Sequence, residues 1–213
     1  MLKKSLYAIF LLSLTLSYAT AQEASSFEAG IHYEVLPTPV PTSDPEKIEV
    51  VAVFAYTCPH CATLEPSLQS WAAQLDDDVY FTHLPAVFSR NWEPLARAYY
   101  VAELSGKLDE THLPMFDAIH VQNNRFRSTD DIAAFYANFG LDKDEFNKLY
   151  NSFAVDTRIK QGQARLRGYQ VTAVPAMVVN GKYHITGAMA GSNTGMLRVV
   201  NYLIDKERAA LAD

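Results

Sequence analysis

Apolar positions follow two periodicities between residues 48 and 84, and together they predict a strand–helix–strand unit. An almost unbroken β-branched run from Ile48 to Tyr56 is typical of a central strand that is buried on both faces. Apolar residues then recur at helical spacing over residues 61–75, and residues 79–84 return to a strand pattern. This order predicts a parallel pair of strands with a right-handed crossover.

The middle of the chain, from residue 91 to about residue 167, is helical almost throughout. The predicted helices cover residues 92–104, 113–121, 128–139, 142–153 and 157–166. Because no strand pattern separates them, they indicate a helical insertion within an α/β framework.

Strand signals return near the C-terminus. Asn180-Gly181 is a strong hairpin signal between predicted strands at 176–179 and 183–186, and an amphipathic helix follows over residues 196–211. Upstream, the proline-rich residues 36–42 predict an extended lead-in, and alternation at 31–35 predicts a short edge strand. The fold class is therefore α/β, with one domain formed by residues 22–88 and 160–213 and a helical insertion domain at 89–159.

The first 21 residues have the pattern of a signal peptide. Lys3 and Lys4 precede a short apolar core, and Ala19-Thr20-Ala21 fits a cleavage site, which predicts processing after Ala21. The alternative is an N-terminal membrane anchor, but the apolar run is shorter than the roughly 20 residues that a span needs. Export would bring the chain to a compartment where disulfides form and persist.

The charge balance argues against nucleic acid as a partner. The chain has 213 residues and a formal net charge of −6, and its pI is near 5.5, whereas nucleic-acid binding requires basic surfaces. A hydrophobic content of 49% with 20% charged residues is that of an ordinary globular chain with a substantial core.

Both cysteines lie in one motif, Cys58-Pro59-His60-Cys61, directly after the predicted central strand. A disulfide within so short a loop would contribute little stability, so we interpret the pair as reactive. Cys58 begins a helix, where the macrodipole favours its thiolate, and Pro59 suits the first turn. Cys61 lies one turn further in and can resolve a mixed disulfide formed at Cys58.

His60 predicts the direction of the redox chemistry. A cationic imidazole near Cys58 stabilises the thiolate and thus the reduced pair, which makes the disulfide a stronger oxidant. The alternative is an exposed histidine that has no influence on the sulfur. The motif predicts a disulfide donor without a cofactor, because the disulfide itself carries the electrons.

A metal site is a competing interpretation of the cysteine pair. Two cysteines at this spacing can form half of a tetrahedral zinc site or handle copper. The chain has no second cysteine pair, and the remaining histidines show no paired ligand spacing: His32, His83, His112, His120 and His184. The sequence therefore predicts no metal site.

Val174-Pro175, just before the hairpin, is the second candidate segment. Its proline can be a tolerated residue at the start of an edge strand, or part of a cis peptide bond that presents the Val174 backbone to a bound peptide. The residues alone leave both interpretations open.

Two motifs give the chain a resemblance to a known family. Phe54-x-Tyr56-x-Cys58-Pro59-His60-Cys61 and the segment from Val174 to Tyr183 resemble the DsbA family of periplasmic thiol:disulfide oxidoreductases, within the thioredoxin superfamily. The resemblance implies a thioredoxin fold with an inserted all-helical domain. It also implies that Pro175 is cis and faces Cys58, and that Val174 binds substrate backbone.

The same resemblance implies partners and a location. The expected substrates are exported proteins with free cysteines, and the expected reoxidising partner is a quinone-linked membrane oxidase of the DsbB type. We expect a monomer in the periplasm. The alternatives are a periplasmic disulfide reductase or isomerase, and a non-enzymatic chaperone-like or metal-delivery protein on a thioredoxin scaffold.

One position departs from the family pattern. Many members have a buried glutamate six residues before the first cysteine, and here that position is Ala52. Glu49 is three residues earlier and would point to the opposite face of a regular strand. Either water or another carboxylate accepts the proton of Cys61, or Cys61 deprotonates less readily.

We therefore expect Ala52→Glu to oxidise its dithiol faster than the wild-type protein, because the added carboxylate would accept the Cys61 proton. Rapid-mixing measurements of dithiol oxidation from about pH 5 to about pH 8 would check this. Equal rates for the two proteins across that range would contradict it.

Overall fold

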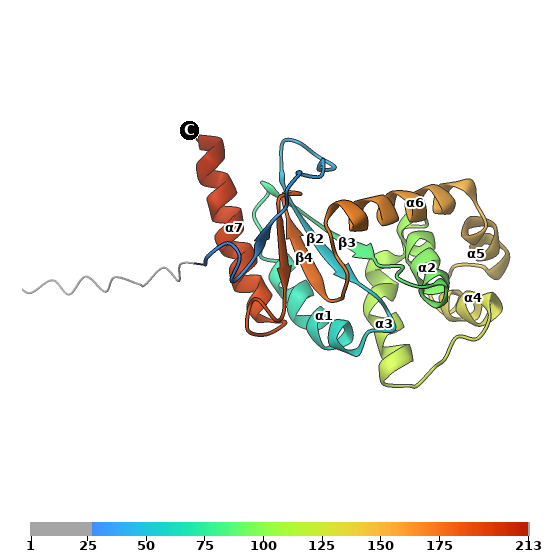
Figure 1. Ribbon diagram of the computed structural model, residues 1–213. Helices are drawn as coiled ribbons and strands as arrows, with labels where there is room; N and C mark the ends of the chain where they lie inside the picture. The colour runs from blue at the N-terminus through green and yellow to red at the C-terminus, as the bar shows by residue number, and fades with distance from the viewer. Residues whose placement is uncertain (1–26, 213) are drawn as a thin grey trace, which may run out of the picture.

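The computed structural model describes residues 27–212, and the predicted signal peptide at residues 1–21 lies outside this range. Among the described residues, no helix combines the length and the apolar character needed to cross a membrane. A sheet with helices on both faces lies beside a cluster of helices (Figure 1).

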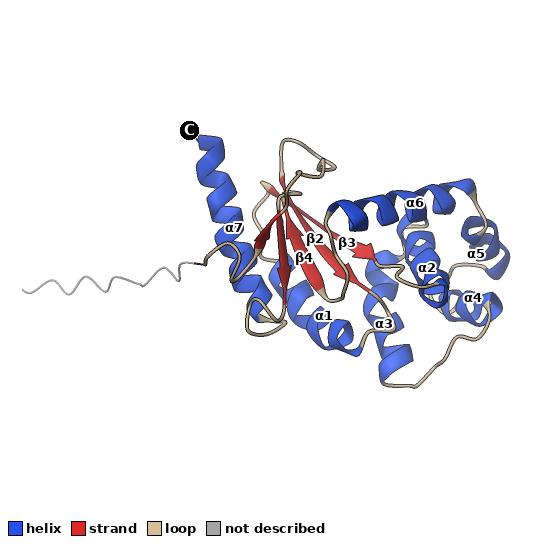
Figure 2. Ribbon diagram, in the orientation of Figure 1, coloured by secondary structure: helices blue, strands red, loops and turns tan. Residues whose placement is uncertain are grey.

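Five strands form one mixed sheet, in the order β1-β5-β4-β2-β3 (Figure 2). The strands are β1 (Glu34–Val35), β2 (Ile48–Phe54), β3 (Val79–Pro85), β4 (Ala176–Val179) and β5 (Tyr183–Thr186). β2 is buried along its whole length, pairs with β3 in parallel and pairs with β4 antiparallel. The predicted central strand and parallel pair are confirmed. The strand ends at Phe54 rather than Tyr56 because the chain turns there, and Cys58 N donates to Ala55 O at 3.0 Å.

The two faces of the sheet are covered differently. Helices α1 (Pro59–Ala72) and α7 (Gly195–Ala212) cover one face, where Ala52 packs in a cluster with Leu64 and Leu203. On the other face, Val51 packs with Leu166 near the end of α6 (Phe153–Gly168). This alternation along β2 is the reason that its sequence is apolar at nearly every position.

The helical cluster consists of η1 (Arg90–Trp92), α2 (Glu93–Leu104), α3 (Leu108–His120), α4 (Thr129–Ala137), α5 (Lys143–Tyr150) and most of α6 (Figure 1). The helix predicted at 142–153 is confirmed as α5, but it ends earlier, at Tyr150, because Ser152 caps the next helix by accepting from Val155 N at 3.3 Å. The helices predicted at 113–121 and 157–166 are both longer in the structure. The helix predicted at 128–139 is confirmed as α4, and it begins with a capping box formed by Ser128 and Asp131.

The predicted domain boundary at residues 159–160 falls inside α6. The first half of this helix packs among the helices through Val155 and Ile159, and Leu166 packs on the sheet. We propose that residues 22–88 and 160–213 form one domain and that residues 89–159 form the other. Helix α6 contributes to both.

The β4–β5 hairpin turns at Asn180-Gly181, as the sequence predicts. Both residues have positive φ, 49° and 60°, which is the requirement of a tight hairpin turn. The proline-rich lead-in crosses this turn, because Val40 N donates to Gly181 O at 2.9 Å. A side chain at position 181 would collide with the Val40 carbonyl oxygen.

We expect Gly181→Ala to lower the free energy of unfolding by about 2 kcal/mol more than Gly140→Ala, because it adds a backbone collision. Gly140 is the matched control, with φ of 79° and nothing within 4 Å of an added Cβ. Urea unfolding of the two oxidised variants would measure the difference. Equal losses would show that the lead-in moves away at no cost.

Candidate active site

The turn between β2 and α1 carries Cys58 as the N-cap residue of the helix. Its backbone is extended, with φ −86° and ψ 115°, and Pro59 occupies the first turn. The Cys58 sulfur accepts a hydrogen bond from Cys61 N at 3.3 Å. A sulfur therefore has the capping role that a serine or aspartate oxygen usually has, and it takes up one of the unpaired N–H groups of the helix start.

The two thiols differ in acidity because they differ in surroundings. The pKa of Cys58 is lowered to about 6, chiefly by the hydrogen bond from the Cys61 side chain, and further by the backbone N–H groups of Cys61 and His60, while burial opposes this. The pKa of Cys61 is raised by the neighbouring Cys58 and by burial. Cys58 is 9% exposed and Cys61 2%, so the more acidic sulfur is also the more accessible one.

His60 and Pro59 are both exposed at the start of α1. The charge of His60 lowers the Cys58 pKa, but it is the weakest of the identified influences, behind the hydrogen bonds of Cys61 and the backbone. The sequence predicted that the helix start and His60 together stabilise the thiolate, whereas the geometry gives the largest part to the Cys61 side chain.

The cis-proline loop brings Val174 to the active sulfur. The Val174–Pro175 peptide bond is cis, as the family resemblance implies. The Cys58 thiol donates to Val174 O at 3.6 Å, although the two residues are 116 positions apart in the chain. The pairing of β4 with β2 causes this proximity, because it aligns the loop before Ala176 with the end of β2.

Helix α3 holds the turn before Cys58 from the other side. His120 Nε2 donates to Tyr56 O at 2.7 Å, and the Tyr56 hydroxyl is hydrogen-bonded to His112 Nδ1 at 2.8 Å. Burial raises the pKa of Tyr56 well above its ordinary value, so its hydroxyl stays neutral. Two histidines that the sequence could not assign therefore fix the active-site turn to the helical part.

Ala52 of β2 occupies the position where many family members have a buried glutamate, and little space remains around it. Ala52 is buried and lines, with Cys61, Glu65 and Pro175, an internal cavity of about 10 Å³. Glu49 points to the opposite face, as predicted, and binds Arg165 and Tyr169. A glutamate at position 52 would exceed this space, so Ala52→Glu also carries a packing cost.

Glu65 is the carboxylate near Cys61 that the sequence analysis missed. It lies one turn after Cys61 on α1, it is 1% exposed, and its charge contributes to the raised pKa of Cys61. Burial opposes its ionisation, but the neighbouring imidazoles of His112 and His83 outweigh burial and lower the pKa of Glu65 to about 2. Its helical spacing from Cys61 and Leu68 was a signal that could have found it.

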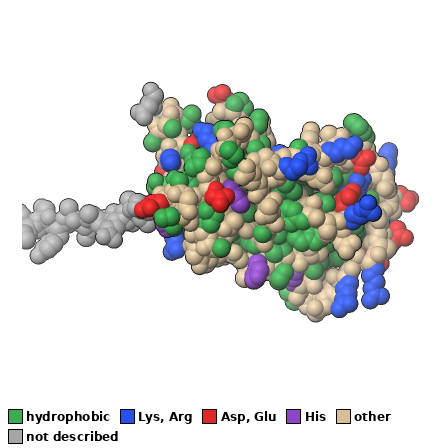
Figure 3. Space-filling view, viewed as in Figure 1, with side chains coloured by type: hydrophobic (Ala, Val, Ile, Leu, Met, Phe, Trp, Pro, Cys, Tyr) green, Lys and Arg blue, Asp and Glu red, His purple; other side chains and the backbone are tan. Residues whose placement is uncertain are grey.

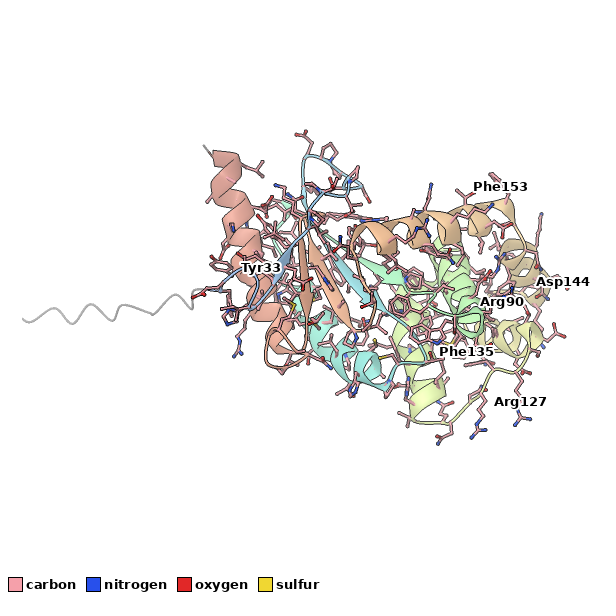
Figure 4. The ribbon with its side chains drawn as sticks, viewed as in Figure 1. Tyr33, Arg90, Arg127, Phe135, Asp144 and Phe153 are labelled. Atoms are coloured by element: carbon pink, nitrogen blue, oxygen red, sulfur yellow. The ribbon has the colours of Figure 1, made fainter. Side chains whose placement is uncertain are left out.

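A cavity lies next to the active-site turn, on the side of the helical part. A cavity of about 340 Å³ opens beside Thr57, between Leu95 of α2 and Phe126 of the loop that leads to α4. Figure 4 shows Arg127 on this loop with its side chain directed away from the body of the molecule. On the face in Figure 3, apolar side chains gather toward the middle, and charged ones are frequent at the helical end.

The chain is similar in sequence to known thiol:disulfide interchange proteins. The model of the DSBA-like thioredoxin domain matches residues 78–193. The thiol:disulfide interchange protein DsbA of Pseudomonas aeruginosa is 38% identical over 207 residues, covering 97% of this chain and 98% of that protein. The DsbA of Azotobacter vinelandii is 39% identical over 192 residues, covering 90% of each chain.

Solved structures give the same result. The crystal structure of Pseudomonas aeruginosa DsbA has a TM-score of 0.84 and 40% identity, and it covers 88% of this chain and 97% of its own. The DsbA oxidoreductase of Xylella fastidiosa has a TM-score of 0.81 and 38% identity, covering 85% of this chain and 98% of its own. The thioredoxin fold with a helical insertion, expected from the sequence motifs, is confirmed.

We expect Cys61→Ala to raise the Cys58 pKa clearly above 6, because it removes the largest stabilising contact of the thiolate, and His60→Ala to raise it less. Alkylation rates of the reduced proteins as a function of pH would measure both values. The Cys58 pKa lies below its ordinary value of 9.0, so the thiolate stabilises the folded, reduced protein against unfolding at high pH. This contribution is lost as the pH falls through about 6. An unchanged pKa in Cys61→Ala would contradict the assignment.

Proposed function

The chain belongs to the DsbA family and is a thiol:disulfide oxidoreductase, and on this basis we propose that it donates its Cys58–Cys61 disulfide to cysteine pairs of exported proteins during oxidative folding. The observation that carries the proposal is the environment of the Cys58 sulfur. It caps the start of α1, it is more accessible than the Cys61 sulfur, and it lies 3.6 Å from the Val174 carbonyl oxygen.

The first step is attack of a substrate thiolate on Cys58 Sγ. The bond between Cys58 and Cys61 breaks, its electron pair leaves on Cys61, and a mixed disulfide joins the substrate to Cys58. Attack at Cys58 rather than Cys61 is favoured because Cys61 is the more deeply buried of the two sulfurs.

The second step releases the oxidised substrate. A second substrate thiolate attacks the substrate sulfur of the mixed disulfide, and Cys58 leaves as a thiolate. Two electrons have then passed from the substrate dithiol to the Cys58–Cys61 pair. The low pKa of Cys58 makes its thiolate a good leaving group and stabilises the reduced pair, which supports an oxidant rather than a reductant.

The other site residues have supporting roles in this proposal. His60 contributes a further electrostatic stabilisation of the Cys58 thiolate, and Pro59 starts the helix without leaving an N–H group unpaired. Val174 and Pro175 present backbone to an extended substrate segment beside the sulfur, where the Val174 carbonyl group already faces Cys58.

The reduced pair must be reoxidised before a second turnover. We assign this step to a quinone-linked membrane oxidase of the DsbB type, with the enzyme acting as a periplasmic monomer after cleavage behind Ala21. The names of the relatives, thiol:disulfide interchange proteins, support the exchange chemistry, and the partner, the location and the monomeric state follow from the family resemblance. No cofactor enters the proposal, because the disulfide carries the electrons.

We expect the Cys58–Cys61 pair to be more oxidising than thioredoxin, whose potential is about −270 mV, when equilibrated with glutathione buffers. We also expect Cys58→Ser and Cys61→Ser each to abolish the reactivation of a reduced, unfolded secreted enzyme, because either change removes the Cys58–Cys61 disulfide that accepts the two electrons of the substrate dithiol. The matched control is Ser105→Ala, a small change far along the chain at the end of α2.

Two results would redirect the proposal. A potential as low as that of thioredoxin would assign the chain to disulfide reduction. Full activity of Cys58→Ser in a chaperone or metal-delivery assay, together with no oxidase activity of the wild-type protein, would favour the binding-protein alternative.

A further inference from the structure

Three side chains with metal-binding atoms meet behind the active site. They are Glu65 of α1, His83 of β3 and His112 of α3, and their ligand atoms all lie within 4.8 Å of one another. Glu65 Oε1 is 2.9 Å from His83 Nε2 and 3.3 Å from His112 Nε2. The two imidazole rings are 4.5 Å apart between centroids and inclined by 53°.

His112 has an unsatisfied nitrogen that points into this cluster. The residue is 2% exposed, and among the described residues its Nε2 atom has no hydrogen-bond partner, although Glu65 Oε1 is near. Its other nitrogen, Nδ1, is occupied by the Tyr56 hydroxyl at 2.8 Å. A buried polar nitrogen without a partner is costly, and an outer contact on the second nitrogen is the usual arrangement of a metal-bound histidine.

The cluster is open to solvent on one side. Both histidines line a cavity of about 450 Å³ between α1, β3, α2 and α3, and Glu65 lies beneath them. Two further acidic side chains, Glu103 and Asp109, line the same cavity. Arg158 pairs with Glu103 at 3.5 Å, so Asp109 supplies most of the negative charge that the cavity presents to a cation, and a fourth coordination position can face the cavity.

We propose that Glu65, His83 and His112 form a binding site for a divalent transition-metal ion, with Zn²⁺ as the best match. Zinc binds imidazole nitrogen and carboxylate oxygen at about 2.0–2.2 Å, so tetrahedral ligand atoms lie roughly 3.3 Å apart. Glu65 Oε1 lies 2.9 Å from His83 Nε2 and 3.3 Å from His112 Nε2, and both distances are close to this value. Two histidines and one glutamate with an open fourth position are a set that zinc accepts.

The sequence predicted no metal site because the three ligands come from three separate elements. His83 and His112 are 29 positions apart, and neither has a partner at the short spacing of a metal-binding motif. The proposed site is distinct from the cysteine pair and does not depend on the redox function.

The alternative is that a proton, shared between Glu65 and the histidines, is the only cation in the cluster. The test uses the full mature protein in its oxidised form, because the Cys58–Cys61 disulfide then offers no thiolate to the metal. Zn²⁺ at about a hundredfold excess over its Kd should raise the Tm by about 5 to 10 °C. This shift should be lost in His83→Gln and in Glu65→Gln.

The matched control is His184→Gln. His184 is also buried and lies 3.6 Å from a carboxylate, Glu34, but it belongs to β5 and is outside the cluster. This variant should keep the full zinc-dependent rise in Tm. A rise that persists in His83→Gln, or the absence of a rise in the wild-type protein, would overturn the proposal.

A second measurement does not depend on whether the variants fold. In the oxidised wild-type protein with nitrogen-labelled histidines, one equivalent of Zn²⁺ should move the imidazole signals of His83 and His112 and leave that of His184 in place. Movement of the exposed His60 alone would show surface binding and would overturn the proposed site.

Discussion

The position of one sulfur at the start of α1 is the constraint on which the active site depends. A helix start leaves backbone N–H groups without partners, and here the Cys58 sulfur accepts one of them, from Cys61 at 3.3 Å. The same contact also favours the thiolate, in addition to the larger effect of the hydrogen bond from the Cys61 side chain, so the cap of the helix contributes to the acidity of the thiol. Because β2 is buried throughout and ends at Phe54, the chain has little freedom in where it places this cap.

The helical part contacts the active site directly. Through His120 and His112, α3 hydrogen-bonds the backbone and the hydroxyl of Tyr56, two residues before Cys58. The cysteines also pack in the same apolar cluster as residues of α2 and α3, such as Tyr99 and Phe116. The insertion thus forms one wall of the active site, while the cis-proline loop forms the other, and neither wall is close to the cysteines in sequence.

The buried negative charge behind the cysteines is carried by a helix residue and not by the central strand. The small side chain of Ala52 leaves only an internal cavity of about 10 Å³, and the buried negative charge is on Glu65 of α1 instead of on the strand. Two histidines contact Glu65, from β3 and α3, and connect it to a solvent-open cavity. A buried carboxylate needs such partners because an isolated charge in the interior is strongly unfavourable.

Much of the fold and half of the site could be predicted from the sequence alone. Local patterns determine the buried strand at Ile48, the hairpin at Asn180-Gly181 and the reactive motif at Cys58, because each depends on residues that are neighbours in the chain. Helix limits such as the break at Ser152 were missed, since apolar spacing continues across a cap. The residues alone left the position of Val174 open, and the family resemblance implied that its loop faces Cys58, which the tertiary structure decided. Only the tertiary structure showed that Glu65, His83 and His112 meet, because strand pairing and helix packing set those distances, which cannot be read from the spacing of residues in the sequence.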